Sequence, residues 1–314
     1  MKILITGGCG YKGSVLVPRL LGLGYKVIVH DTHWFGSYLK PHKNLELFKT
    51  DIRDTEKINF DQVNAFIHLA NVANDPAVEL NPTSSWEINV LASQQLVDKA
   101  IRQNVEHIIF ASSGSVYGVK EEPKVTEELP LVPISTYNKT KMVAERVFLS
   151  YSNQAKIHCV RPAKVCGLSP RMRLDVAVNL LTFQAISNQK IRVLGGSQVR
   201  PNIHIDDIAN LYIHLLINKD NIDSGCYNAG FENISIIDIA QKIKNQTQCE
   251  INIEPSNDPR SYRQDSSKII NTGFKPKKTV NDAITEIISS YKNGFLKDIP
   301  EWHTVKWMKT NNFS

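Results

Sequence analysis

A turn with glycine at every third position, Gly7–Gly13 (GGCGYKG), directly follows the short apolar run Ile3–Thr6 and precedes a helical pattern at Val15–Leu23. The first glycine permits a tight turn, the second lets the backbone approach a ligand, and the third permits close packing of helix on strand. The free amide groups at the start of such a helix favour a bound phosphate. The sequence therefore predicts a strand–turn–helix unit that holds the pyrophosphate of a dinucleotide.

Short β-rich runs alternate with helical patterns over residues 1–165. The runs are Ile3–Thr6, Val27–His30, Leu45–Phe48, Ala65–Leu69, His107–Ala111 and Ile157–Val160. Helical patterns occupy Trp86–Arg102 and Asn138–Tyr151. Strands that alternate with helices form parallel sheets with helices on both faces, so we expect an α/β, Rossmann-like, doubly wound fold.

The pattern changes after residue 165. Helical patterns follow at Asp175–Ser187, Asp207–Ile217, Ser235–Asn245 and Val280–Tyr291, and apolar runs at Ile191–Leu194 and Ile203–Ile205. A chain of 314 residues exceeds one ordinary core. We therefore expect a nucleotide-binding domain at 1–165, with returns near 202–218, and a smaller C-terminal α/β substrate lobe at 166–201 and 219–314.

The composition excludes several classes of protein. No apolar run approaches the roughly 18 residues of a membrane span, so no membrane partner is expected. The net charge of +6 is scattered in ones and twos, which disfavours nucleic acid as a partner. The N-terminal run leads straight into the glycine turn, so no secretory signal is expected. Five cysteines with no C-x-x-C pair predict reduced thiols, a cytoplasmic protein and no metal site.

An acidic residue, Asp31, ends the second predicted strand. A carboxylate at this place accepts hydrogen bonds from the ribose hydroxyls of an adenosine. It also repels a 2′-phosphate, because two negative charges would then lie side by side. The sequence therefore predicts NAD as the cofactor in preference to NADP.

A possible proton-transfer site lies beyond the fifth predicted strand. Tyr137 and Lys141 are four residues apart at the start of a predicted helix, so both side chains lie on one face. A nearby ammonium favours the phenolate, and an oxidised nicotinamide would add a second positive charge, so we expect both to lower the pKa of Tyr137 towards that of a general base. The serine-rich segment Ser112–Gly118 follows the strand His107–Ala111, at the sheet edge where ligands bind.

These features together resemble the extended short-chain dehydrogenase/reductase family, in particular its nucleotide-sugar epimerase/dehydratase branch. The matching segments are Gly7–Gly13, Asp51–Asp54, His68–Ala70, Ser112–Gly118, Tyr137–Lys141, Arg161–Pro162 and Arg200–Asp207. Within that branch, the run Ser169–Asp175 resembles a subgroup that includes 4-dehydrogenases of nucleotide-linked heptoses.

The resemblance implies a role for each matching residue. The implied catalytic residues are Ser113, Tyr137 and Lys141. The implied cofactor-binding residues are Gly7, Gly10, Tyr11, Lys12, Gly13, Asp31, Asp51, Ile52, Leu69, Ala70, Asn89, Ser112, Tyr137, Lys141, Pro162 and Val165. The implied substrate-binding residues are Ser113, Lys164, Arg171, Arg173, Asn179, Arg200 and Arg260.

Two lysines depart from the family pattern. Lys12 stands where an apolar residue usually follows the tyrosine of the glycine turn, so a phosphate contact is expected to differ. Lys164 stands where many sugar epimerases carry an asparagine that contacts the substrate. His204 is expected to end a strand and cap the next helix, which we favour over a metal ligand.

The implied function is that of an NAD-dependent nucleotide-diphospho-sugar epimerase with a transient 4-keto intermediate. The alternatives are a nucleotide-sugar 4-dehydrogenase that stops at the ketone, a 4,6-dehydratase, and a non-enzymatic NAD-binding protein. Gly114 and Ser115 stand where 4,6-dehydratases carry an Asp–Glu pair, which argues against elimination. The intact set of catalytic residues argues against the non-enzymatic alternative.

The resemblance also implies a homodimer. In the family, helices that correspond to Trp86–Arg102 and Asn138–Tyr151 pair across a two-fold axis as a four-helix bundle. The apolar positions offered at helical spacing are Leu91, Leu96, Val143 and Val147.

Overall fold

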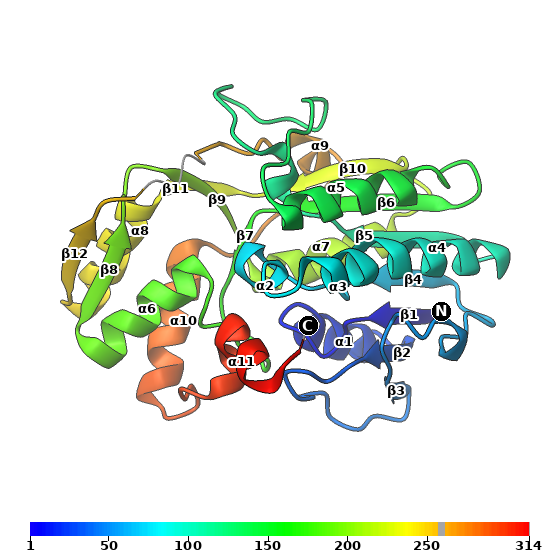
Figure 1. Cartoon of the computed structure of the whole chain (residues 1–314), viewed down its shortest axis with the longest axis horizontal. Helices are drawn as coiled ribbons and strands as arrows, with labels where there is room; N and C mark the ends of the chain where they lie inside the picture. The colour runs from blue at the N-terminus through cyan, green and yellow to red at the C-terminus, as the bar shows by residue number, and fades with distance from the viewer. Residues whose placement is uncertain (257–260, 314) are drawn as a thin grey trace.

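A parallel sheet of seven strands forms the centre of the computed structural model, which describes residues 1–256 and 261–313 (Figure 1). The strand order is β10-β6-β5-β4-β1-β2-β3. The strands are β1 (Lys2–Thr6), β2 (Lys26–Asp31), β3 (Leu45–Lys49), β4 (Ala65–His68), β5 (His107–Ala111), β6 (Lys156–Pro162) and β10 (Gly225–Ala229). All neighbouring pairs are parallel, which confirms the predicted α/β, doubly wound fold.

Both faces of this sheet are buried under helices. Ile3 and Ile5 of β1 pack into one core together with α1 (Gly13–Gly22) and α7 (Ile205–Ile217). Leu4, between them, points to the opposite core, which includes α4 (Ser93–Arg102) and α5 (Thr136–Leu149). Because successive side chains of a strand alternate between faces, a sheet covered on both sides needs the continuously apolar strands that this sequence has.

A second group of elements, called the lobe, follows the sheet. Its members are β7 (Lys164–Cys166), α6 (Ala177–Asn188), β8 (Lys190–Leu194), β9 (Val199–His204), β11 (Glu232–Ser235), α8 (Ile236–Thr247), β12 (Glu250–Glu254) and α10 (Val280–Lys292). The strands form two small sheets, β11-β9-β7 and β12-β8. A separate apolar core joins the second sheet to α6, α8 and α10. Figure 1 shows the lobe beside the carboxyl ends of the main strands.

The remaining elements are short. They are α2 (Asp75–Val78), α3 (Pro82–Trp86), a π-helical turn (Glu87–Ala92), η1 (Thr55–Lys57), η3 (Gly114–Tyr117), α9 (Ser267–Ile270), η4 (Pro300–Trp302) and α11 (Thr304–Asn311). The C-terminal helix α11 leaves the lobe and packs against α2. Within the described residues, no helix is both long and apolar enough to cross a membrane.

Two elements differ from expectation. β10, in a segment that the sequence assigned to the lobe, is an edge strand of the main sheet. Its residues, GCYNA, lack an apolar pattern, and it is a strand because it pairs with β6. The helix predicted at Trp86–Arg102 instead begins at Pro82 and contains the π-helical turn before α4.

A buried ion pair joins α5 to β6 beneath the carboxyl ends of the strands. The side chains of Arg161 and Glu145 are 4% and 0% exposed, and Arg161 Nη2 lies 2.6 Å from Glu145 Oε1. Arg161 Nε also donates to Glu145 Oε2 at 2.9 Å, and Ser112 Oγ donates to the same oxygen at 2.6 Å. The guanidinium further donates to the Tyr117 hydroxyl at 2.7 Å.

We expect Glu145→Gln to reduce the free energy of unfolding by about 3–5 kcal/mol, because it leaves the Arg161 charge buried without a counter-charge. Urea denaturation followed by circular dichroism measures this. Glu254→Gln is the matched control, since it removes one partner of an exposed pair with Arg192 and should change stability little. Equal, small effects of both variants would contradict the importance of the buried pair.

Candidate functional site

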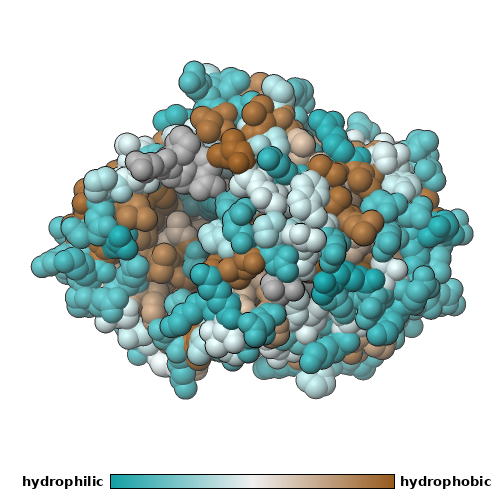
Figure 2. All heavy atoms as spheres, in the orientation of Figure 1, coloured by the Kyte–Doolittle hydropathy of each residue, from teal (hydrophilic) through white to brown (hydrophobic). Residues whose placement is uncertain are grey.

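A cavity of about 600 Å³ lies at the carboxyl ends of the main strands. Its walls come from the loops after β1, β2, β4 and β5, from β7 and the start of α6, and from α11. On the face drawn in Figure 2, the surface is hollowed between the lobe and the main sheet, next to β7 and α6. Parallel α/β sheets bind ligands at this edge.

Most residues singled out from the sequence line this cavity. They are Gly7, Gly10, Tyr11, Lys12, Gly13, Asp31, Asp51, Ile52, Leu69, Ala70, Ser112, Ser113, Tyr137, Lys141, Pro162, Lys164, Val165, Arg171 and Arg173. Asn89, Asn179 and Arg200 do not line it. Arg260 lies outside the described residues.

The glycine turn is built so that only bare backbone fits. Gly7 has a φ of +75°, and a Cβ there would lie 2.5 Å from the backbone nitrogen of Ala70. A Cβ on Gly13 would lie 2.4 Å from the carbonyl oxygen of Gly8. These approaches are shorter than any contact a side chain tolerates, so glycine is required at both positions. The turn thus presents its backbone to the cavity before α1 begins.

Asp31 ties the end of β2 to the glycine turn. Its Oδ2 accepts a hydrogen bond from the Cys9 amide at 3.0 Å, and its Oδ1 accepts one from the His33 amide at 2.8 Å. Each carboxylate oxygen can accept a second bond, so the group still offers acceptors to a ligand. Asp51, at the next wall of the cavity, is paired with Arg53 at 2.8 Å.

Ser113, Tyr137 and Lys141 meet at another part of the same wall. Ser113 Oγ lies 2.7 Å from Ser115 Oγ, and a hydrogen-bond interaction of Ser113 lowers the pKa of Tyr137. Lys141 is buried and its Nζ donates to the carbonyl oxygen of Ala111 at 2.8 Å. α5 therefore presents a phenol and an ammonium to the cavity, and the loop after β5 presents a hydroxyl.

Lys141 is not among the groups that lower the pKa of Tyr137 in this structure. Burial outweighs the other influences and raises the pKa of the Tyr137 phenol to about 12, while Arg173 lowers it. Burial also holds the pKa of Lys141 well below its usual value, and the charge of Lys12 adds to this effect. The reason is desolvation, which disfavours the charged form of each group.

Lys12 reaches the same part of the cavity. Its Nζ lies 3.5 Å from the hydroxyl of Tyr212 on α7, and burial together with the charge of Arg173 lowers its pKa to about 8. Arg173 itself forms a two-point ion pair with Asp175, with contacts of 3.0 and 2.8 Å. Within the described part of the chain, Lys12 forms no ion pair with a carboxylate.

The predicted residues away from the cavity have structural contacts instead. Asn89 is buried and pairs with the backbone of Val72, so its side chain holds the loop after β4. Asn179 Nδ2 donates to the Tyr11 hydroxyl at 3.0 Å and thereby fixes the side chain of the glycine turn. Arg200 is buried in β9, where its Nη1 donates to the carbonyl oxygen of Val199 at 3.3 Å.

Other residues of the cavity wall were not anticipated from the sequence, and five of them come from two segments far apart in the chain. Trp34 and Phe35 follow β2, and Thr304, Val305 and Met308 belong to α11. No motif marks them, because they come together only when the C-terminal helix packs beside the loop after β2. The indole nitrogen of Trp307 donates to the carbonyl oxygen of Trp34 at 2.6 Å and fixes this contact.

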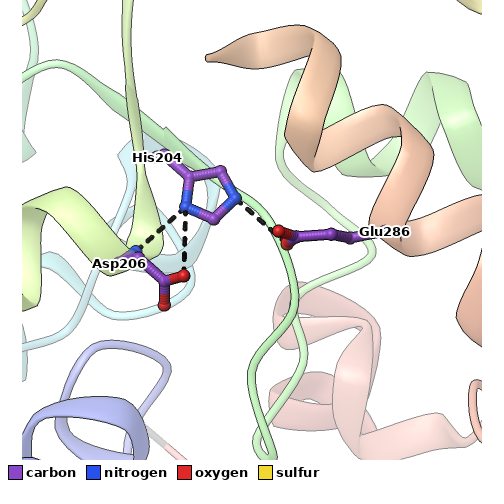
Figure 3. Close-up of side chains that lie close together, drawn as sticks. All are labelled: His204, Asp206 and Glu286. Carbon is purple, nitrogen blue, oxygen red and sulfur yellow. Dashed lines mark hydrogen bonds and ion pairs between the residues drawn. The ribbon is translucent and has the colours of Figure 1, made fainter. Parts of the chain in front are cut away.

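His204 has the role of a helix cap. It ends β9, and its Nδ1 accepts a hydrogen bond from the Asp206 amide at 3.1 Å, as expected for the residue before α7. Figure 3 shows its ring between Asp206 and Glu286. These three residues are close enough to hold a cation, but Asp206 is paired with Arg19 and Glu286 with Lys278. The two carboxylates therefore already have positive partners.

Comparisons with known proteins give a consistent picture. A model described as "NAD dependent epimerase/dehydratase family" matches residues 3–230. The UDP-glucose 4-epimerase of Lactobacillus helveticus is 28% identical over 314 residues, covering 90% of this chain and 95% of that protein. A putative UDP-glucose 4-epimerase of Methanocaldococcus jannaschii is 29% identical over 307 residues, covering 93% and 98%.

Solved structures have the same fold. The UDP-glucuronic acid 4-epimerase from Bacillus cereus, solved in complex with UDP-glucuronic acid and NAD, aligns with a TM-score of 0.82 at 25% identity. The alignment covers 93% of this chain and 99% of that chain. The likeness thus extends over both the sheet and the lobe.

We expect the Tyr137 hydroxyl to remain protonated up to about pH 10 in protein freed of bound ligands, because burial raises its pKa to about 12. The difference between the tyrosinate absorbance titrations of the unaltered protein and Tyr137→Phe isolates this group. A tyrosine that titrates near neutral pH and disappears in the variant would contradict the expectation.

Proposed function

Because the chain belongs to the NAD-dependent epimerase/dehydratase family, we propose that it is a nucleotide-diphospho-sugar epimerase that works through a transient 4-keto sugar. The observation that carries the proposal is the convergence of Ser113, Tyr137 and Lys141 on the cavity that also contains the glycine turn. The names of two relatives, a UDP-glucose 4-epimerase and a putative UDP-glucose 4-epimerase, support the same proposal.

The residues around the cavity fit NAD. The backbone of the glycine turn would hold the diphosphate, since Gly7 and Gly13 have no room for a side chain. Asp31 would accept hydrogen bonds from the adenosine ribose, and Lys141 would hold the nicotinamide ribose. Bound NAD supplies a hydride acceptor that can return the hydride to the same sugar carbon.

Proton transfer is assigned to Tyr137. Its phenolate would take the proton of the sugar 4-hydroxyl as the hydride leaves carbon 4, which produces a ketone. Ser113 would donate a hydrogen bond to the same oxygen and so stabilise its developing charge. After the keto-sugar turns over, hydride return to its other face would be matched by return of the proton from Tyr137. The positive charge of Arg173 favours the phenolate that this step requires, and an oxidised nicotinamide would add a second positive charge.

Elimination of water is disfavoured by the surroundings of Ser113. A Cβ at Gly114 would lie 3.2 Å from Gln264 Nε2 and from the Pro162 carbonyl oxygen, so a carboxyl side chain does not fit easily. Ser115 lines the cavity, but a hydroxyl is a poor proton carrier at neutral pH. Burial alone would raise the pKa of Asp175, yet Arg173 lowers it, so this carboxylate is not suited to donate a proton.

The second candidate is a nucleotide-sugar 4-dehydrogenase, and Lys12 is the observation that favours it. Its ammonium is near enough to Lys141 to lower the pKa of that residue. Positive charge at this end of the cavity opposes the cationic oxidised nicotinamide more than the neutral reduced ring. Such a bias would favour oxidation of the sugar over its re-reduction.

Incubation with a panel of nucleotide hexoses and heptoses, followed by mass spectrometry and NMR, tests the proposal. Epimerisation gives an unchanged mass with altered stereochemistry. A product lighter by two hydrogens would support the dehydrogenase instead, and a product lighter by one water would contradict both.

Replacing the base tests the mechanism. We expect Tyr137→Phe to lower turnover by about 10²–10⁴-fold while folding persists, because the ring remains and only the proton acceptor is lost. Ser113→Ala should lower turnover less, since one hydrogen bond is removed and the base remains. Tyr151→Phe on the last turn beyond α5 is the matched control, because its hydroxyl faces Asp98 away from the cavity. Near-normal turnover of Tyr137→Phe would require another base.

We also propose that the protein is a homodimer, paired through the surface of α4, α5 and the π-helical turn. Leu91 is 53% exposed and Trp86 is 37% exposed there, and Figure 2 shows hydrophobic residues gathered over these helices. Leu96, expected at this surface, is instead fully buried in the core against the sheet. Val143 and Val147 are half-buried.

We expect light scattering at micromolar concentration to give twice the chain mass, and Leu91→Lys to give a monomer. The charge would be buried without a partner in the paired state. Ile253→Lys, at a similarly exposed position on β12, should remain dimeric. A monomeric unaltered protein would contradict the proposal.

A further inference from the structure

Arg171 is a buried charge without a carboxylate partner. Its residue is 2% exposed, and in the described part of the chain it forms no ion pair. Its Nη2 donates to Thr304 Oγ1 at 3.2 Å, its Nε has no partner, and its guanidinium lies 4.1 Å from the ring centre of Phe35. Arg173, two residues later, is by contrast fully paired with Asp175.

Burying an unpaired guanidinium costs free energy unless a ligand supplies the missing negative charge. Burial and the charge of Arg173 lower the pKa of Arg171, which shows that its cationic form is poorly stabilised by the protein. A guanidinium keeps its charge over the ordinary pH range, so deprotonation does not relieve the free-energy cost of burial. Because Arg171 lines the cavity, an anion bound there would provide its partner.

The contacts of Arg171 place it at the cofactor end of the cavity. Its backbone amide donates to Ser14 Oγ at 3.3 Å, in the first turn of α1, directly after the glycine turn. Phe35, beneath its guanidinium, follows β2 four residues after Asp31. The charge of Asp31 acts on Arg171, whereas Arg173 interacts with Tyr137. The two arginines therefore serve different ends of one cavity.

We propose that Arg171 is a ligand of the NAD diphosphate, acting beside the backbone amides of the glycine turn. A planar guanidinium can donate two parallel hydrogen bonds to phosphate oxygens, and Arg171 has unused donors for such bonds. The sequence had assigned Arg171 to the substrate, and this proposal reassigns it to the cofactor. The inference rests on the NAD dependence of the family and not on epimerisation.

The C-terminal helix holds this arginine in place. Thr304 of α11 is the side-chain acceptor of Arg171, and Thr304, Val305 and Met308 line the cavity. α11 is fastened to the loop after β2 through the hydrogen bond from Trp307 to Trp34 and the stacking of Trp34 on Phe313, with ring centres 5.3 Å apart. A diphosphate bound to Arg171 would thus be enclosed by the end of the chain, which favours a cofactor retained between turnovers.

Binding measurements on cofactor-freed protein test the proposal. We expect Arg171→Met to weaken both NAD and ADP-ribose by the same factor, about 10–100-fold, because both ligands carry the diphosphate. The melting temperature of the cofactor-free variant should not fall, since an unpaired buried charge is removed. Arg192→Met, which removes an exposed arginine on β8, is the matched control and should leave both affinities unchanged.

Arg171→Lys provides a second variant that keeps the charge. It should lose less affinity than Arg171→Met for both ligands, because an ammonium binds phosphate as a point charge without the guanidinium fork. If Arg171→Met did not fold, Arg171→Lys would still measure the loss of affinity for NAD and ADP-ribose.

Several outcomes would overturn the proposal. Unchanged NAD affinity with a lower melting temperature would make Arg171 a purely structural residue. Weakening of NAD without weakening of ADP-ribose would place it at the nicotinamide or at the substrate. Loss of NADP affinity alone would assign it to a 2′-phosphate. Failure of the sugar-nucleotide assay would leave these binding results intact, so the two proposals are tested separately.

Discussion

Glu145 and Arg161 form an ion pair inside the protein, and the placement of the cavity's reactive groups depends on it. Glu145 belongs to α5, which also carries Tyr137, and it accepts a hydrogen bond from Ser112, next to Ser113. Arg161 lies in β6 and extends the network to Tyr117. This buried charge pair therefore fixes α5, which carries Tyr137, relative to the loop that carries Ser113. The pair is rigid because neither charge can separate and return to water.

The sheet was predictable because its signals are local. Continuous apolar runs after each turn define six of the seven strands, and the glycine turn determines which edge binds ligands. β10 was not predictable, since its residues become a strand only through pairing with β6. The place of α11 was not predictable either, because its contact with the loop after β2 joins residues about 270 positions apart, such as Trp34 and Trp307.

Sequence reasoning located the site better than it described its electrostatics. Most of the residues that it singled out line the cavity, because motif positions follow the strand ends. It did not anticipate how strongly burial raises the pKa of Tyr137, since four-residue spacing shows that Lys141 shares a helix face with Tyr137 but not how burial acts on both groups. It placed Leu96 at the surface of the helix, whereas Leu96 is buried in the core. Helical periodicity alone does not reveal which apolar face of a helix packs on the sheet.

Three cations in the cavity lack a carboxylate partner within the described residues: Lys12, Lys141 and Arg171. Each loses hydration, and burial lowers the pKa of each. The protein alone thus leaves three buried cations without a direct counter-charge, which is unfavourable. Anionic ligands would supply the balance, and any ligand that binds only the folded state stabilises it. A dinucleotide diphosphate at Arg171 and a substrate diphosphate elsewhere would together account for cations that the chain itself leaves without a direct counter-charge.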